Sequence, residues 1–301
     1  MNFKWNVDFV KHWKWYFLVS GVILVLGLVA LLVFGLILGV DFQGGTRLDF
    51  HVGQTVTQEE MIGFVKEQGL VPSTTQLASE GQYVIMRFEE EIGKERLAAL
   101  RQALQQRYGE EANIQESTVD PTFARELARK AMLGVLAASV GIVIYIMIRF
   151  EYRFAVAALI SLLHDALMVI AFFALFRLEV DLTFIVAVLT VVGYSINDTI
   201  VIFDRIRENM KTYKLKTSDD YQRLVNDSIR QTLARSVNTL ITVIFMAAAL
   251  YLFGPDSIRN FSLAMLIGLV SGGYSSLFIA SQLWYLWRVR DLRRRRTAAA
   301  S

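Results

Sequence analysis

The feature that most constrains this chain is a set of long apolar runs, each bounded by charged residues. The first of them, Phe17 to Val40, has 24 residues and no charged side chain. An α-helix rises about 1.5 Å per residue, so a run of this length is sufficient to cross a hydrocarbon core about 30 Å thick. The apolar core of a cleaved signal peptide is shorter and precedes a small-residue cleavage site. The sequence therefore predicts a retained membrane-spanning helix here.

Five more apolar runs follow, and 54% of the 301 residues are hydrophobic, which argues against a pair of ordinary soluble domains. Together the runs predict an integral membrane α-helical bundle with six transmembrane helices. The expected spans are 16–40, 131–148, 154–176, 182–203, 236–253 and 261–287. Within the intervening loop 204–235, four apolar residues at helical spacing predict a basic amphipathic helix on the membrane surface. These residues are Tyr221, Leu224, Val225 and Ile229.

The distribution of Lys and Arg next to the span ends indicates the orientation of the chain. Basic residues cluster in residues 1–15, in the short loop after the second span, in 204–235 and in the tail 288–301. Lys and Arg are enriched on the cytoplasmic side of a membrane. A six-span chain with these four segments on that side has cytoplasmic N- and C-termini. Segment 41–130 is then expected on the outer side.

Segment 41–130 has the pattern of a small soluble domain that alternates strands and helices. Thr57 is placed to cap a helix, with Glu60 three residues further on. The expected strands and helices are 46–52, 57–68, 75–77, 83–88, 93–108 and 113–119. Their order, βαββαβ, predicts an α+β ferredoxin-like domain between the first two spans.

Several classes of function are excluded by residues that the chain lacks or disperses. It has no cysteine, which removes disulfides, thiolate catalysis and zinc sites built on Cys. Its three histidines, His12, His51 and His164, have no metal-ligand spacing, and the net charge of +3 leaves no nucleic-acid footprint. The spans contain no His/Glu cluster, Ser/His pair or Gly-rich phosphate loop. We expect no metal, no cofactor, no nucleic-acid partner and no enzymatic activity.

Polar residues in the fourth and fifth spans are the first functional candidates, because ionisable groups inside a membrane are costly. Asp198 lies about 9 Å inside the cytoplasmic end of the fourth span at 1.5 Å per residue, with Asn197 beside it. Arg235 begins a polar stripe on the fifth span near the same depth. An Asp–Arg pair that separates when the carboxylate is protonated would act as a proton-driven switch. The alternative is a static buried pair that only fixes helix packing.

The third and sixth spans carry two further candidates. Asp165 lies in the third span, and His164 beside it offers a simple way to satisfy the carboxylate. In the sixth span, small residues recur at every fourth position, namely Ala264, Gly268, Gly272, Ser276 and Ala280. Such a row lets another helix approach closely, so we expect Gly268, Gly272 and Ser276 to form a packing face.

Several motifs resemble those of a known family. The segment Gly39 to Thr46, which contains Asp41, Gly44 and Gly45, is similar to the signature that opens the outer domain in the SecD/SecF family of protein-export membrane subunits. Segments 192–199 and 203–208 are similar to the fourth-helix motif of the SecF branch in particular. Segments 235–242 and 272–276 also match the family. The resemblance covers nearly the whole chain. It departs at Asp120, where the family has a glycine, which permits backbone angles that Asp adopts less readily.

The resemblance implies one subunit of a larger machine in the bacterial inner membrane, with segment 41–130 in the periplasm. SecF pairs with SecD in a transporter of the resistance-nodulation-division superfamily. The pair associates with the SecYEG channel and YajC and uses the proton-motive force to promote export of preprotein chains. In that scheme ion coupling involves Asp198 and Arg235, with Asp165 and Asn197 as further candidates. Sodium is the alternative coupling ion.

Two other functions stay open at this level. A half-transporter of the resistance-nodulation-division efflux type shares the six-helix plan but has a much larger outer domain. A passive assembly factor would use the same polar residues only to hold partner helices together.

Overall fold

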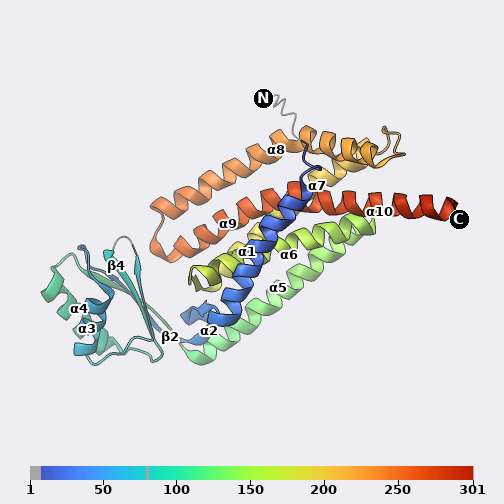
Figure 1. The fold of residues 1–301 in the computed structure, drawn as a ribbon. Helices are drawn as coiled ribbons and strands as arrows, with labels where there is room; N and C mark the ends of the chain where they lie inside the picture. The colour runs from blue at the N-terminus through green and yellow to red at the C-terminus, as the bar shows by residue number, and fades with distance from the viewer. Residues whose placement is uncertain (1–7, 79–80, 301) are drawn as a thin grey trace. The chain divides into compact units, whose positions relative to one another are not determined.

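A computed structural model describes residues 8–78 and 81–300 (Figure 1). The chain divides into two compact units. The helical unit comprises Met1–Ile37 and Val135–Ser301, and the smaller unit comprises Leu38–Gly134. Residues 1–7 of the predicted N-terminal segment and residue 301 of the predicted tail lie outside the described residues.

Long helices make up most of the helical unit. In chain order they are α1 (Trp13–Phe34), α5 (Pro121–Arg149), α6 (Tyr152–Leu175), α7 (Leu182–Asn209), α8 (Ser218–Phe253), α9 (Arg259–Ser275) and α10 (Ser281–Ala300). The short elements are β1 (Ile37–Leu38), β6 (Glu179–Val180), η2 (Asp256–Ile258) and the π-helical η3 (Ser276–Ala280). Figure 1 shows α9 and α10 running in line, because η3 joins them without a break. In the described part of the chain, six helices are long and apolar enough to cross a membrane, with α9 and α10 counted as one. The prediction of six apolar helices of spanning length is confirmed.

The segment between the fourth and fifth spans differs from the prediction. The sequence predicted a loop at 204–235 and a separate span at 236–253. Instead α7 continues to Asn209, and α8 is a single helix of 36 residues that starts at Ser218. Thr217 begins α8 with a capping box. The sequence predicted an amphipathic helix within 204–235 but did not join it to the span at 236–253, because the polar residues between them interrupt the apolar run.

The amphipathic stretch packs on the helix bundle instead of lying on a membrane. Leu224, Val225 and Ile229 are fully buried, and they share one core cluster with Phe203 of α7 and Trp284 of α10. The prediction of a surface helix was therefore wrong. The apolar face that carried the prediction is covered by protein.

The helices of this unit pack in a consistent set of pairs. α1 contacts α6, both α7 and α8 contact α9, and α6 contacts α7 and α9. Trp284 of α10 is completely buried and stacks on Phe154 of α6, with ring centroids 4.9 Å apart. By contrast, α1 exposes much of its apolar surface, and the Leu32 side chain is 76% exposed. A large exposed apolar surface of this kind is what a lipid-facing helix presents.

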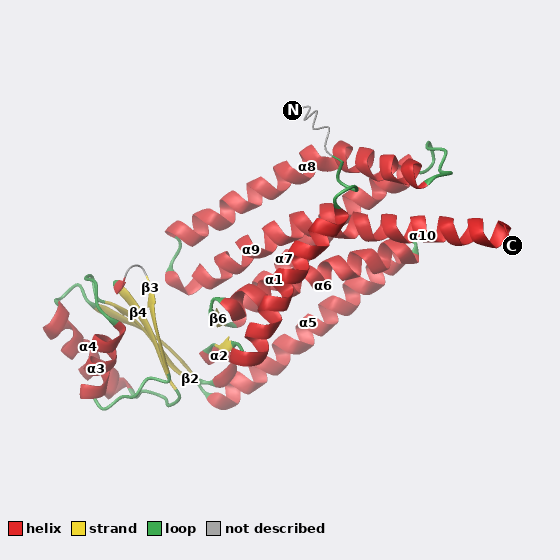
Figure 2. Cartoon of the chain, in the orientation of Figure 1, coloured by secondary structure: helices red, strands yellow, loops and turns green. Residues whose placement is uncertain are grey.

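The smaller unit is a four-stranded antiparallel sheet with two helices on one face (Figure 2). Its elements are α2 (Val40–Gln43), β2 (Gly45–His51), α3 (Gln58–Glu67), β3 (Thr74–Ala78), β4 (Tyr83–Phe88), α4 (Lys94–Tyr108) and β5 (Asn113–Val119). The strand order is β3-β4-β2-β5, and every neighbouring pair is antiparallel. Alternate residues of β2, Leu48 and Phe50, are buried in one core with Leu100 and Leu104 of α4.

Side-chain caps define where helices in this unit begin. Thr57 Oγ1 accepts a hydrogen bond from the Glu60 amide at 3.2 Å, which confirms the predicted cap of α3. Asp120 Oδ1 accepts from the Thr122 amide at 2.8 Å and the Phe123 amide at 3.1 Å, at the start of α5. Hydrogen bonds from the Thr122 side chain and then from these amides lower the pKa of the Asp120 carboxyl. Asp120 therefore fixes the first turn of α5.

Candidate functional site

Helices α7, α8 and α9 meet around a small pocket that contains Asp198. Its volume is about 20 Å³, which is room for roughly one water molecule. The polar and small residues that line it are Tyr194, Ser195, Asn197, Asp198, Thr239, Gly268, Gly272 and Gly273. Residues predicted separately as coupling and packing residues thus lie in one place. The i and i+4 spacing on each helix brings them to the same faces.

Asp198 and Arg235 lie near each other, but no ion pair within 4.0 Å joins them in the described part of the chain. Asp198 is half-buried beside Ser236, and the charge of Arg235 acts on its carboxylate. Arg235 itself is exposed on α8. The predicted pairing is therefore not formed in this conformation, and the predicted role of the two residues in ion coupling stays a prediction.

The polar face around this pocket is open on the surface of the chain. On α7, Tyr194 is 39% exposed and Asn197 is exposed, while on α8 Arg235, Asn238 and Thr239 are exposed. Polar groups at bilayer depth normally face a bundle interior or a water-filled path. If this face lay against lipid, each of these polar groups would lose its contact with water and gain no hydrogen-bond partner in exchange, which is costly.

The predicted row of small residues on α9 lies against α7. A Cβ atom at Gly268 would lie 2.4 Å from Val191, and one at Gly272 would lie 3.0 Å from Ser195. One turn further along, Ser276 Oγ lies 2.8 Å from Thr199 Oγ1. Contacting positions advance by four residues in the same direction on both helices, so α7 and α9 run parallel. Only residues without a large side chain allow this approach.

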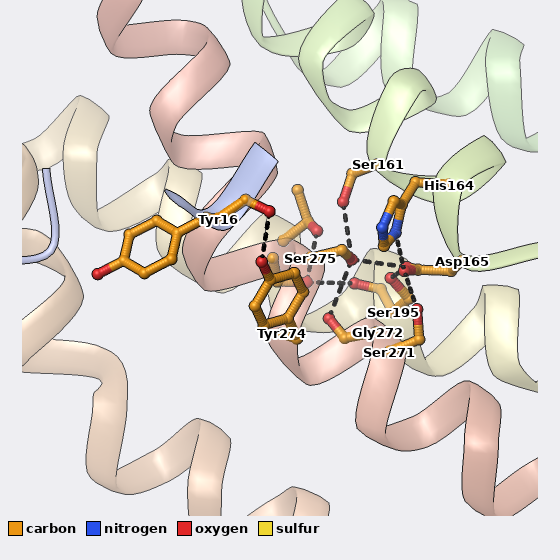
Figure 3. A network of polar contacts seen from close by, with 11 residues as sticks. Tyr16, Ser161, His164, Asp165, Ser195, Ser271, Gly272, Tyr274 and Ser275 are labelled. Carbon is orange, nitrogen blue, oxygen red and sulfur yellow. Dashed lines mark hydrogen bonds and ion pairs between the residues drawn. The ribbon is translucent and has the colours of Figure 1, made fainter. Parts of the chain in front are cut away.

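A second polar centre lies between α6, α7 and α9, where the Asp165 carboxylate is completely buried (Figure 3). Its Oδ1 accepts from Ser271 Oγ at 3.0 Å and lies 3.0 Å from His164 Nδ1. Its Oδ2 accepts from Ser195 Oγ at 2.5 Å and from Ser275 Oγ at 2.7 Å. The carboxylate therefore has four partners, from three helices.

Only one of these four partners was predictable from the sequence. His164 was proposed to satisfy Asp165, and it does contact the carboxylate. The three serines were missed as ligands, since nothing local in the sequence shows that Ser195 and the pair Ser271 and Ser275 approach Asp165. The available signal was the four-residue spacing of Ser271 and Ser275, which places both hydroxyls on one helix face.

The glycines of the outer-domain motif are required by close backbone contacts. Gly44 and Gly45 have φ angles of +79° and +99°, which favour glycine. A Cβ atom would lie 2.6 Å from Pro121 Cα at Gly44 and 2.2 Å from the Phe88 carbonyl at Gly45. Asp41 lies in the first turn of α2, directly before them. This motif therefore shapes the entry into β2.

Comparison with known families agrees with these features. A model described as "Protein export membrane protein SecD/SecF, C-terminal" matches residues 99–290, which is more than half of the chain. A second model, "SecD/SecF GG Motif", matches residues 29–56 and so includes Gly44 and Gly45. The chain belongs to the SecD/SecF family. The region of this chain that the first model matches contains Asp165, Asp198 and Arg235.

Individual SecD/SecF relatives differ in how much of their length the chain spans. The protein translocase subunit SecDF of Bacillus subtilis is 46% identical over 292 residues, which cover 97% of this chain and 39% of SecDF. The protein translocase subunit SecF of Alicyclobacillus acidocaldarius is also 46% identical, over 97% of this chain and 96% of SecF. The crystal structure of SecDF from Thermus thermophilus, described as translocon-associated, matches with a TM-score of 0.84 and 30% identity, over 95% of this chain and 39% of that one. The chain thus spans about two fifths of the SecDF proteins and nearly all of the SecF protein.

Proposed function

We propose that this chain is a SecF-type subunit of an auxiliary complex of the Sec translocase, and that it uses the proton-motive force to promote export of preproteins across the inner membrane. The observation that carries this proposal is the 46% identity to a translocase subunit SecF along 96% of its length. The two translocase relatives favour protein export over drug efflux. The chain acts as a transporter component and not as an enzyme.

The proposal includes a topology. Both termini lie in the cytoplasm of a bacterial cell, because the basic segments cluster on that side of the six spans. The smaller unit lies in the periplasm and is a ferredoxin-like domain. Its βαββαβ element order and its antiparallel strand order β3-β4-β2-β5 support that description.

In this proposal Asp198 is the proton-binding group. The positive charge of Arg235 acts on its carboxylate, and Asn197 is a neutral polar neighbour in the same pocket. A carboxylate that is half-buried at bilayer depth beside a water-sized pocket is accessible to a proton yet costly to keep charged. A proton that moves through the membrane potential supplies about 2.3 kcal/mol per 100 mV. That energy changes the populations of two conformations if they bind the proton with different affinity.

The exposed polar face on α7 and α8 supports the proposal that a partner subunit binds there. We infer that SecD covers this face, so that Asp198 acts at the interface between two helix bundles. SecYEG, YajC and the exported preprotein are the further partners in the proposal. A passive assembly factor would need the same covered face but no titration of Asp198.

The test uses inverted membrane vesicles that contain the full chain and its partners. Asp198→Asn keeps the size of the side chain and removes its charge, so we expect loss of the translocation stimulated by a proton gradient. Asp227→Asn, on α8 outside the pocket, is the matched control and is expected to retain that stimulation. Normal stimulation in the Asp198→Asn vesicles contradicts proton coupling and favours the assembly factor. Stimulation that follows a sodium gradient instead identifies sodium as the coupling ion.

A further inference from the structure

The Asp165 centre carries a negative charge that its hydroxyl partners do not neutralise. An ionised carboxylate accepts about four hydrogen bonds, and Asp165 has four partners at 3.0 Å or less. Acceptance on both oxygens is the hydrogen-bond pattern of an ionised carboxylate, which has no proton to donate. The group is nevertheless completely buried, and the desolvation penalty of an isolated buried charge is several kcal/mol even after the protein relaxes around it. A positive charge nearby would offset that cost.

His164 is the base that faces this charge. Its Nδ1 lies 3.0 Å from Asp165 Oδ1, and an ionised carboxylate can only accept, so Nδ1 carries the hydrogen atom. The other ring nitrogen, Nε2, is buried and has no hydrogen-bond partner among the described residues. The side chain is only 6% exposed. Nε2 therefore presents a free lone pair inside the bundle, with a carboxylate on the far side of the same ring.

The groups that face this pair from the neighbouring helices are not cationic. α9 places the Tyr274 ring 6.4 Å from the His164 ring, and the Tyr274 hydroxyl donates to the Tyr16 carbonyl of α1 at 2.8 Å. α7 contributes Ser195, and the sequence of η3 contains no titratable residue. Arg288 of α10 pairs with Glu151, which precedes the first residue of α6. Within the described chain, no Lys or Arg makes an ion pair with Asp165.

We propose that His164 and Asp165 form a proton-binding site inside the bundle, which takes one proton at His164 Nε2 and is linked to the Asp198 pocket by Ser195. The proton comes from a hydronium ion, which is left as a neutral water molecule, and binds the Nε2 lone pair, so the neutral ring becomes an imidazolium against the Asp165 carboxylate. Figure 3 shows Ser195 and Asp165 joined across the interface between α6 and α7. The same serine also lines the pocket of Asp198, one turn away on α7.

The link to Asp198 rests on the proposed proton coupling, whereas the proton site itself does not. Binding a proton at His164 withdraws negative charge from Asp165 Oδ1 and weakens the pull of the carboxylate on its hydroxyl donors. Ser195 is the donor that also borders the second site. Its position between the two carboxylates makes it a positioning residue for Asp198.

The experiment is nitrogen NMR of the full chain in lipid nanodiscs with labelled histidine. His12→Gln and His51→Gln leave His164 as the single signal. We expect the Nδ1–H tautomer at high pH, protonation of Nε2 as the pH falls, and at least about a tenfold lower proton affinity of His164 in Asp165→Asn. An Nε2–H tautomer at high pH, or no protonation of Nε2 between about pH 4 and pH 9, overturns the proposal.

Two serine variants keep the test valid if Asp165→Asn does not fold. Ser271→Ala removes one donor from the oxygen that His164 contacts, so it should raise the proton affinity of His164. Ser262→Ala, which removes a buried hydroxyl bonded to the carbonyl of Ile258, the N-cap residue of α9, should leave it unchanged. Equal effects of the two variants contradict the proposal.

The link is tested by Asp198→Asn, which should change the proton affinity of His164 about fivefold, and by Ser195→Ala, which should abolish that change. A His164 titration that does not respond to Asp198→Asn refutes the link. Because the NMR measurement needs no partner and no export, its outcome is separable from that of the vesicle experiment.

Discussion

The contact between α9 and α7 at Gly268 gives the sharpest prediction for the helix packing that holds the candidate site. A Cβ atom at Gly268 would lie 2.4 Å and 2.7 Å from the two methyl carbons of Val191. Carbon atoms in favourable contact are about 3.5–4.0 Å apart, so the overlap exceeds 1 Å for one methyl. Val191 is 1% exposed, so its methyl groups are held among neighbouring side chains. Overpacking of this kind costs about 1–3 kcal/mol.

Gly268→Ala also gains helix propensity, which offsets up to about 1 kcal/mol of that cost. With the full offset we expect a net loss of about 0–2 kcal/mol in the free energy of unfolding, and a loss of about 1–3 kcal/mol relative to a glycine-to-alanine change without the clash. Gly141→Ala on α5 is the matched control, because a Cβ atom there meets nothing within 4 Å. It gains the same propensity without the clash, so it should be neutral or stabilising.

The assay is unfolding of the full chain in mixed micelles with increasing denaturing detergent, followed by tryptophan fluorescence, since Trp284 is fully buried in the bundle. Val191→Ala removes the two methyl groups that a Cβ at Gly268 would meet. The double variant Gly268→Ala/Val191→Ala should be more stable than the sum of the single effects by about 1 kcal/mol. If Gly268→Ala is no worse than Gly141→Ala, or if Val191→Ala gives no rescue, close packing of α7 on α9 is not the reason for this glycine.

Three further predictions concern the smaller unit. Gly45→Ala should destabilise the unit more than Gly53→Ala. Both glycines have positive φ, but only at Gly45 would a Cβ lie against the Phe88 carbonyl. Thermal melting of the two full-length variants compares them, and equal losses of melting temperature would count against the contact. The Asp120 carboxyl has a pKa below its unfolded value, so its cap on α5 contributes above the unfolded pKa and is lost as the pH falls through the folded pKa. Hydrogen exchange in the first turn of α5 should therefore accelerate in acid in the wild type, and Asp120→Ala should remove that dependence. Partial burial and the hydrogen bond to Glu60 raise the pKa of Tyr108 to about 12, so its contribution is present below the unfolded pKa and is lost as the pH rises through about 12. The ultraviolet phenolate titration of the wild type minus that of Tyr108→Phe should show this midpoint, and a midpoint near 10 would contradict the effect of the Glu60 hydrogen bond.

Local patterns in the sequence determined much of this protein. Each spanning helix needs about 20 apolar residues in a row, so hydropathy alone located all six. The cap at Thr57 was equally predictable, because an N-cap depends on a few adjacent residues. Asp198 was identified from the sequence because a carboxylate inside an apolar span is conspicuous without any knowledge of its neighbours.

Other features depended on contacts between distant parts of the chain. The apolar face of α8 at Leu224 and Ile229 has the same pattern whether it meets lipid or protein, and only the packed bundle shows that it meets Phe203 and Trp284. The three serine donors to Asp165 come from positions 30 to 110 residues away, so the sequence near Asp165 does not reveal them. Asp198 remains the candidate that the sequence identified, while His164 and Asp165 became a site only when three helices were brought together. Periodicity and hydropathy report which face of a helix is apolar, whereas the partner of that face is decided by tertiary packing.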